Sequence, residues 1–250
     1  MVEDAEQGDA GNFVPLEWPG DIMTCVLPLF AVTETQAKFV GSSFMFRDRL
    51  VTARHVATEL EELVNKSYGV KAIACAIVLT PDGRSWRCRV PAIEAASDHY
   101  ANSDVALCTI DIPDDLAAGY NLVSLDVSRD WVNEGTEVVA FGHTGIDRMI
   151  DLNDAGTLAE VLGLVRMEAV VTGSFTESMH IKAPCFEMAG PLPGGTSGGP
   201  IFELDTGRVV GVCSYAATPN SQLERPRSFG TMTRNLFDEP KALPQSGWLP

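Results

Sequence analysis

The chain has 250 residues, of which 45% are hydrophobic and 21% are charged, a composition typical of a folded globular protein rather than a disordered one. Its 18 basic and 34 acidic residues give a formal net charge of −16, which disfavours nucleic acid and anionic membranes as partners. No apolar run is long enough to span a bilayer, and the acidic N-terminus has no signal-peptide pattern. We therefore expect a cytoplasmic protein.

The first 20 residues are acidic and contain Gly and Pro, so they predict a tail or wrapping arm. Leu60, Leu63 and Val64 repeat at helical spacing and predict a short helix over residues 56–65. Apolar or alternating stretches predict strands at 22–32, 36–46, 50–53, 71–80, 85–95 and 105–110.

A polar stretch then separates this group of strands from a second one. We place the N-terminal barrel at 21–115, the connector at 116–135, the C-terminal barrel at 136–236 and a C-terminal tail at 237–250. The strands predicted in the second group are 136–141, 163–172, 178–183, 200–204, 209–215 and 230–233. Many short strands in two groups, with little helix, predict an all-β fold of paired barrels or a sandwich.

Six cysteines are distributed along the chain. None forms a Cys-x-x-Cys pair, and most lie inside apolar runs, which predicts buried thiols. A disulfide between Cys185 and Cys213 stays open as the less favoured alternative in a reducing compartment. No ligand spacing supports a metal site, and we expect no cofactor.

Gly194-Gly195-Thr196-Ser197-Gly198-Gly199-Pro200 is the stretch that points most directly to chemistry. Glycines on both sides of a serine allow a tight turn with an exposed hydroxyl and converging N–H groups, which an acyl-transfer nucleophile requires. A flexible Gly-rich loop is the alternative. A base and an orienting acid elsewhere in the chain would decide between them.

His55 and Asp104 are the candidates for these two roles. His55 lies where the predicted strand 50–53 leads into the helix, a position where scaffolds often place chemistry. Asp104 precedes an apolar strand, where a partly buried carboxylate needs a partner such as a histidine N–H. Asp98 is the rival acid, but no apolar strand follows it. His99, His143 and His180 are expected in surface-loop, turn-packing and strand positions, respectively.

The order His55, Asp104, Ser197 in an all-β chain resembles the chymotrypsin-like serine peptidases. Thr52-Ala53-Arg54-His55 is similar to the Thr-Ala-x-His of that family, and Asp104-Val105-Ala106-Leu107 to its Asp-Ile-Ala-Leu. Gly195-Thr196-Ser197-Gly198-Gly199-Pro200 is similar to its Gly-Asp-Ser-Gly-Gly-Pro. The resemblance covers about residues 40 to 235. It implies two six-stranded antiparallel β-barrels with the active site in the cleft between them.

The resemblance also implies a role for each site residue. Ser197 would attack the scissile carbonyl, His55 would carry its proton, and Asp104 would orient the imidazole. The N–H groups of Gly195 and Ser197 would bind the oxyanion. Ser214 would support Asp104. The edge Ser214-Tyr215-Ala216 would pair with an extended protein or peptide substrate.

Thr196 departs from the family pattern, because the activated members have an acid there that pairs with a new N-terminus. Neither that acid nor the Ile-Val-Gly-Gly start is present, so the chain looks closer to the bacterial, HtrA-type branch, without a PDZ module. An activating protein partner is one hypothesis for its control. A second class of function is a protease-fold binding or scaffold protein that is latent or inactive without a partner.

The specificity pocket is predicted by counting back from the nucleophile. Its base falls near Pro191, with Leu192 following, and Ala216 and Gly230 are predicted at its walls. No acid stands at the base, so we expect a small or apolar P1 residue. Glu187 reaching into the pocket would instead restore a preference for a basic residue.

Overall fold

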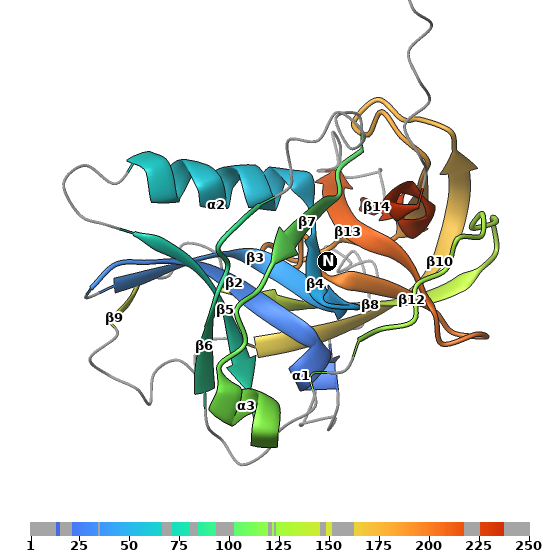
Figure 1. Ribbon diagram of the computed structural model, residues 1–250. Helices are drawn as coiled ribbons and strands as arrows, with labels where there is room; N and C mark the ends of the chain where they lie inside the picture. Colours follow the sequence, from blue (N-terminus) through green and yellow to red (C-terminus); the bar gives the residue numbers. More distant parts are fainter. Residues whose placement is uncertain are drawn as a thin grey trace, which may run out of the picture.

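Two antiparallel β-sheets make up the body of the protein (Figure 1). The computed structural model describes residues 14–15, 22–34, 36–66, 72–80, 85–93, 103–119, 122, 124–145, 149–151, 163–217 and 226–237. The rival acid Asp98, His99 and most of the two predicted tails lie outside these residues.

The N-terminal sheet has the strand order β6-β5-β2-β3-β4-β7, with β9 also paired to β3. Its strands are β2 (Val26–Val32), β3 (Gln36–Phe46), β4 (Arg49–Thr52), β5 (Ile73–Leu79), β6 (Ser85–Arg89), β7 (Ala106–Thr109) and β9 (Met149–Asp151). Isolated bridges from Arg89 to Asp111 and from Ile93 to Cys108 bring the chain after β6 back to the β7 side. The sheet therefore curls toward a barrel.

The C-terminal barrel is closed, because β8 pairs with both β10 and β12. Around the barrel the order is β8-β10-β11-β14-β13-β12, and β1 adds to the outer edge of β10. These strands are β1 (Val14–Pro15), β8 (Glu137–Thr144), β10 (Gly163–Phe175), β11 (Cys185–Ala189), β12 (Pro200–Glu203), β13 (Val209–Ala217) and β14 (Arg227–Met232). The predicted fold class, all-β with two chymotrypsin-like barrels, is confirmed.

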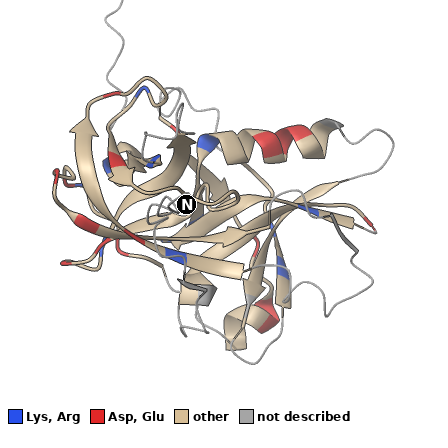
Figure 2. Ribbon diagram, turned by 180° about the vertical axis from the view of Figure 1, so that it is seen from behind, with Lys and Arg blue, Asp and Glu red and all other residues tan. Residues whose placement is uncertain are grey.

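Helices are few and lie outside the sheets (Figure 1). They are α1 (Ile22–Cys25), α2 (Arg54–Lys66), α3 (Asp114–Gly119) and the 3-10 helix η2 (Thr233–Leu236). Helix α2 buries Val56, Ala57 and Leu60 and exposes a glutamate-rich face (Figure 2). None of the described helices is long and apolar enough to cross a membrane.

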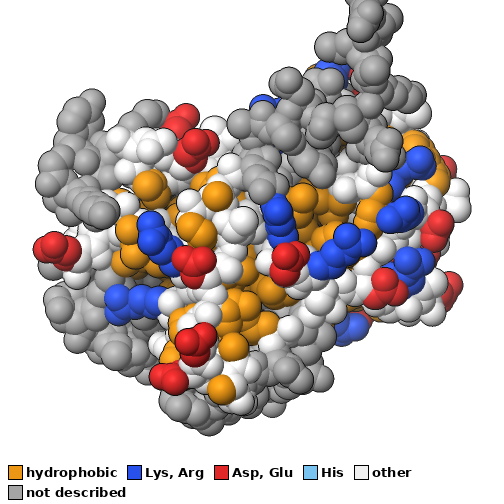
Figure 3. Space-filling model, viewed as in Figure 1, with side chains coloured by type: hydrophobic (Ala, Val, Ile, Leu, Met, Phe, Trp, Pro, Cys, Tyr) orange, Lys and Arg blue, Asp and Glu red, His pale blue; other side chains and the backbone are white. Residues whose placement is uncertain are grey.

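An apolar core joins the two sheets, and this fixes how the two halves of the site meet. One buried cluster combines residues of the N-terminal sheet with Val209 and Val212 of β13. A second combines Phe30 and Phe39 with Phe141 of β8. Burial of this much aromatic and branched aliphatic surface is the main force that holds the sheets together. On the face shown in Figure 3, charges of both signs are interspersed with apolar side chains.

The structure differs from the sequence prediction in several places. The strand predicted at 178–183 is absent, and β11 begins at Cys185 instead, directly after Pro184, which has no N–H to donate to a ladder. Helix α3, which was not predicted, crosses the boundary placed between the N-terminal barrel and the connector at residues 115 and 116. β9, where no strand was predicted, lies within the range assigned to the C-terminal barrel but pairs with β3 of the N-terminal sheet. All six cysteines are free and buried, so the Cys185–Cys213 disulfide is not formed.

Candidate active site

His55 and Asp104 are directly hydrogen-bonded. The Nδ1 of His55 lies 2.9 Å from Oδ2 and 3.1 Å from Oδ1 of Asp104, and the His55 backbone N–H donates to Oδ1 at 3.0 Å. His55 is the second residue of α2, and Asp104 lies two residues before β7. Pairing of β4 with β7, with Thr52 opposite Ala106, brings the two segments together. The carboxylate thus holds both the ring and the backbone of the histidine.

The environment raises the pKa of His55 above its ordinary value of 6.5. Partial burial acts in the opposite direction and lowers the pKa, but the hydrogen bond and charge of Asp104 and the charge of Glu59 outweigh it. The side chain of Asp104 is 19% exposed and that of His55 is 49% exposed. The imidazolium form is therefore stabilised while the ring stays accessible to a second molecule.

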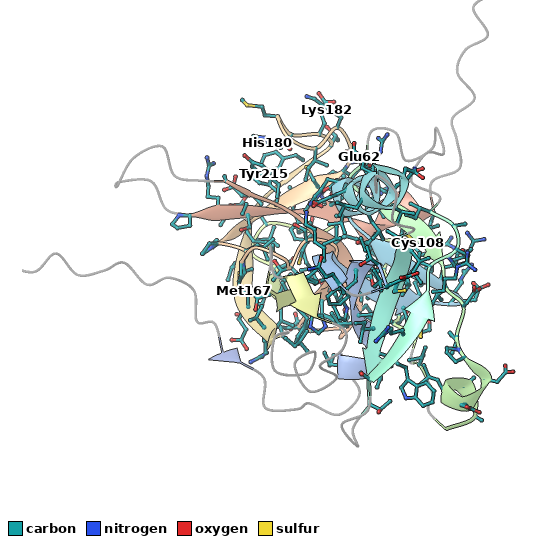
Figure 4. All side chains as sticks on the ribbon, turned by 90° about the vertical axis from the view of Figure 1, so that its left-hand side faces the viewer. Glu62, Cys108, Met167, His180, Lys182 and Tyr215 are labelled. Atoms are coloured by element: carbon teal, nitrogen blue, oxygen red, sulfur yellow. The ribbon has the colours of Figure 1, made fainter. Side chains whose placement is uncertain are left out.

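A cavity of about 770 Å³ opens beside this pair, with walls from both sheets. The N-terminal side contributes His55, Asp104 and α2, and the C-terminal side contributes His180 and Tyr215. Figure 4 shows Glu62 on α2 and the labelled His180, Lys182 and Tyr215 at the same end of the molecule. Among the described residues, no group of His, Cys, Asp or Glu side chains is placed to hold a metal ion.

Ser197 lies on a turn between β11 and β12 that the N-terminal sheet contacts closely. Ser42 of β3 donates its backbone N–H to the Ser197 carbonyl at 2.8 Å. A Cβ added at Gly41 would lie 2.8 Å from both methyl carbons of Val56 and 3.1 Å from the Ser197 carbonyl oxygen. Because Val56 follows His55, the serine turn and the start of α2 meet at Gly41.

The glycines around Ser197 adopt backbone angles that other residues avoid. Gly195 has φ +99° and Gly198 has φ +88°. The Thr196 N–H donates to the Pro193 carbonyl at 3.2 Å, which closes a four-residue turn with Gly195 in third place. A positive φ in that place is what a type II turn requires. The N–H groups of Gly195 and Ser197 make no backbone hydrogen bond within the described part of the chain.

Thr196 stabilises this turn from within. It is 2% exposed, and its hydroxyl donates to the Pro193 carbonyl at 2.7 Å. It also lies against Gly142 of β8, where an added Cβ would come within 2.6 Å of the Thr196 Cα. The residue that stands where activated relatives have an acid therefore bonds to its own turn.

The model for the trypsin-like peptidase domain matches residues 41–212, more than half of the chain. The chain belongs to the trypsin-like peptidase domain family. As a member of that family it is a serine endopeptidase. No curated protein sequence matches it.

Solved structures of HtrA-type and related proteases share the fold of this trypsin-like domain. Deg5 is 16% identical with a TM-score of 0.58, and the match covers 87% of each chain. The Rv3671c protease of M. tuberculosis, in its active form, is 16% identical with a TM-score of 0.53, covering 95% of this chain and 91% of that one. The HtrA-type protease AlgW with a decapeptide is 15% identical with a TM-score of 0.54, covering 86% of this chain and 62% of that one.

Of the residues predicted to form the specificity pocket, Leu192 contacts strand β14 at the 190–192 loop, whereas Gly230 faces the barrel core. Leu192, next to Pro191, donates its N–H to Ser228 Oγ at 2.8 Å, and that hydroxyl donates to the Gly190 carbonyl at 2.8 Å. Gly230, by contrast, faces the barrel core, because an added Cβ would lie 2.6 Å from Ile201 Cδ1. Ser228, which sequence reasoning missed, is therefore the residue of β14 that contacts the 190–192 loop.

The carboxylate of Glu187 contacts Arg227 and Thr172. Its carboxylate lies 3.2 Å from Arg227 Nη1 and accepts the Thr172 hydroxyl at 3.1 Å. Its side chain is 17% exposed. A neighbouring arginine already neutralises this charge, which argues against a role in binding a basic P1 residue.

Ser214 and Tyr215 line the cavity beside His55, but the Ser214 hydroxyl makes other contacts than the one expected with Asp104. The Ser214 hydroxyl donates to the Val212 carbonyl at 3.1 Å and shares a 2.7 Å hydrogen bond with Thr231 Oγ1, rather than supporting Asp104. Tyr215 and Ala216 pair with β14 on one side only, because β12 reaches no further along β13 than Val212. Their other edge is unpaired within the described residues.

His180 was expected in a strand, and the structure places it in an exposed bend at the cavity. Its ring stacks on Tyr215, with ring centroids 4.1 Å apart and planes 20° apart. His143 was expected to pack in a turn, but it lies in strand β8, where it is fully buried and its Nε2 donates to the Val26 carbonyl at 3.0 Å. Burial lowers the pKa of His143 to about 4, although the Val26 carbonyl acts to raise it. The sequence carried no signal for the stack, which depends on two segments about 35 residues apart.

Proposed function

We propose that this serine endopeptidase cleaves peptide bonds with Ser197 as the nucleophile, His55 as the general base and acid, and Asp104 as the group that orients His55. The Ser197 hydroxyl would lose its proton to Nε2 of His55 as it attacks the scissile carbonyl. The protonated ring would then deliver that proton to the leaving amine. In the second half of the reaction, His55 would take a proton from water as the water attacks the acyl carbonyl. His55 would then return the proton to the Ser197 oxygen as the acyl group leaves.

The observation that carries this proposal is the bond from His55 Nδ1 to the Asp104 carboxylate at 2.9 Å. With Nδ1–H bonded to the carboxylate, the neutral ring has its lone pair on Nε2, which is the atom that must accept a proton. The raised pKa of His55 also makes the ring a better base. The turn that carries Ser197 meets the start of α2, the helix that carries His55, at Gly41, which supports the pairing of these two residues.

The N–H groups of Gly195 and Ser197 would stabilise the oxyanion. The support is the type II turn at Pro193–Thr196, with Gly195 at φ +99°, and the lack of other backbone partners for these two groups within the described chain. Donors that are fixed before reaction stabilise developing charge without reorganisation, and this is often the largest single contribution to rate.

The substrate would be an extended peptide with a small or apolar P1 residue. The unpaired edge at Tyr215 and Ala216 offers a place for an added strand. Pairing of Glu187 with Arg227 leaves the 190–192 loop as the pocket base, where Pro191 and Leu192 carry no charge. Strong preference of the enzyme for Arg or Lys at P1 would contradict this assignment.

Control by a partner protein is part of the proposal. Thr196 bonds to Pro193 and has no carboxylate to pair with a newly cleaved N-terminus. Cleavage of the N-terminus should therefore leave activity unchanged, whereas an activating partner protein should raise it. A large gain in activity on N-terminal processing alone would contradict this.

The test is hydrolysis of a peptide library by the wild type and by His55→Ala, Asp104→Asn and Ser197→Ala. We expect Ser197→Ala and His55→Ala to abolish cleavage, and Asp104→Asn to reduce kcat by about 10⁴-fold, as the loss of the orienting acid does in other triads. Glu61→Gln, an exposed change on α2, is the control. Full activity of Ser197→Ala would overturn the assignment of the nucleophile.

A further inference from the structure

Ser42 is a fully buried polar residue in the middle of β3, next to the serine turn. Its backbone N–H donates to the Ser197 carbonyl at 2.8 Å, and its hydroxyl donates to the Gly195 carbonyl at 2.9 Å. A residue of the N-terminal sheet therefore holds two carbonyls of a turn that belongs to the C-terminal barrel. The strands that meet here, β3 and β8, lie near the centre of Figure 1.

These two bonds fix alternate peptide planes of the turn. The Gly195 carbonyl belongs to the plane between Gly195 and Thr196, and the Ser197 carbonyl to the plane between Ser197 and Gly198. The Ser197 N–H lies in the plane between them, and the Gly195 N–H in the plane just before them. Because peptide units are rigid and glycines rotate freely, holding the two carbonyls restricts where both N–H groups point.

The hydroxyl of Ser42 is itself oriented by its neighbours. The His143 N–H donates to Ser42 Oγ at 2.8 Å, so a lone pair of that oxygen is occupied and its proton is left for Gly195. The Ser42 carbonyl accepts the Thr52 hydroxyl at 2.7 Å. Thr52 ends β4, three residues before His55. Ser42 thus connects the strand leading to the base, the strand β8 and the nucleophile turn.

We propose that Ser42 is a positioning residue that keeps the Gly195–Ser197 turn in the shape needed to bind the oxyanion. The expected effect of Ser42 on the reaction rate rests on the proposed function. The expected effect of Ser42 on the shape of the turn does not depend on that function. Ser42 touches no substrate. It acts through the carbonyl of Gly195, and its side chain should matter more in the transition state than in substrate binding.

Ser43 provides a matched control. It is the next residue of β3, is equally buried, and its hydroxyl also donates to one backbone carbonyl, that of Leu27 at 2.9 Å. Leu27 lies on β2, away from the turn. Ser43→Ala removes one buried hydroxyl and one hydrogen bond, whereas Ser42→Ala removes one buried hydroxyl and two hydrogen bonds, because the His143 N–H also donates to it. Ser42→Ala should therefore lower the denaturant midpoint more than Ser43→Ala does. Only Ser42→Ala releases the Gly195 carbonyl.

The first measurement is steady-state kinetics of the two variants on one peptide substrate. Removal of an entire oxyanion donor costs about 10²–10³ in kcat. Loss of the group that holds such a donor should cost less, so we expect Ser42→Ala to lower kcat about 10- to 100-fold with KM changed less than about twofold. Ser43→Ala should keep kcat within about threefold. Equal losses in the two variants would overturn the proposal.

The second measurement, amide hydrogen exchange over residues 190–199, needs no activity. Ser42→Ala should speed exchange in this segment relative to Ser43→Ala, because the turn loses a constraint. If Ser42→Ala fails to fold, Ser42→Cys takes its place. The cysteine thiol is a weaker donor than the serine hydroxyl, so exchange in residues 190–199 should still be faster in Ser42→Cys than in Ser43→Ala. Faster exchange in a protein with an unreactive Ser197 would refute the proposed function and uphold the role of Ser42. Indistinguishable exchange would refute that role.

Discussion

Gly198 follows Ser197, and a side chain at this position has no room. An added Cβ would lie 2.0 Å from the Ser42 carbonyl oxygen and 2.2 Å from Thr52 Oγ1. The backbone angle φ is +88°, which also penalises any L side chain. Gly135 is a matched control, because its φ is +87° and nothing lies within 4 Å of an added Cβ. The two Gly→Ala variants therefore share the cost of backbone strain and differ in packing.

The size of the difference follows from these contacts. The shared strain costs about 1–2 kcal/mol of unfolding free energy. Overpacking adds about 1–3 kcal/mol at Gly198, toward the upper end because the contacts include a backbone oxygen that cannot turn away. With an m-value of about 2 kcal/mol/M in urea, Gly198→Ala should unfold at a urea concentration about 1 M lower than Gly135→Ala.

The assay is urea unfolding followed by tryptophan fluorescence and circular dichroism. Peptidase activity measured below the unfolding transition should also be lost in Gly198→Ala, because relief of the clash must move the turn that carries Ser197. Gly135→Ala should remain active. Equal midpoints for the two variants, or full activity of Gly198→Ala, would refute the close approach of this turn to β3 and β4.

Two further predictions concern pH. Glu59 helps to raise the pKa of His55, so Glu59→Gln should move the acidic limb of kcat/KM to lower pH. Glu61→Gln should leave it in place, and an upward shift would contradict the account. His143 has a pKa of about 4 when folded, below its unfolded value of 6.5, so stability falls as pH drops below 6.5. Between pH 7 and 5 this loss should be about 2 kcal/mol in urea unfolding, and His143→Gln should lack it.

The sequence predicted the elements with strong local signals. The hairpin expected at 36–46 and 50–53 is β3 and β4, and the helix expected at 56–65 is α2, which starts two residues earlier. The strand expected at 178–183 was wrong. Ile181 and Ala183 are buried there at alternate positions, as in a strand, but ladder pairing begins only after Pro184. Alternating apolar residues in a sequence indicate which side chains are buried. They do not indicate whether a neighbouring strand is present to form backbone hydrogen bonds.

Site residues were predictable where their chemistry shows in a short motif. His55 and Asp104, which lie 49 residues apart, do meet, as the motif order indicated. The contacts of Ser214 and the stack of His180 on Tyr215 depend on how loops and strands pack, which no local pattern encodes. Ser42 left one usable signal, its place in a pair of serines between apolar residues of a predicted strand, since a buried polar group needs a partner.

The central claim is that Ser197 is an activated nucleophile, and covalent labelling with a fluorophosphonate probe tests it most directly. Intact mass and peptide mapping of the treated protein should show one adduct, on Ser197, with labelling that slows below the pKa of His55. Ser197→Ala should take up no probe, while Ser43→Ala should label like the wild type. An adduct that persists in Ser197→Ala, or a wild-type protein that stays unlabelled with and without partner proteins, would contradict the account.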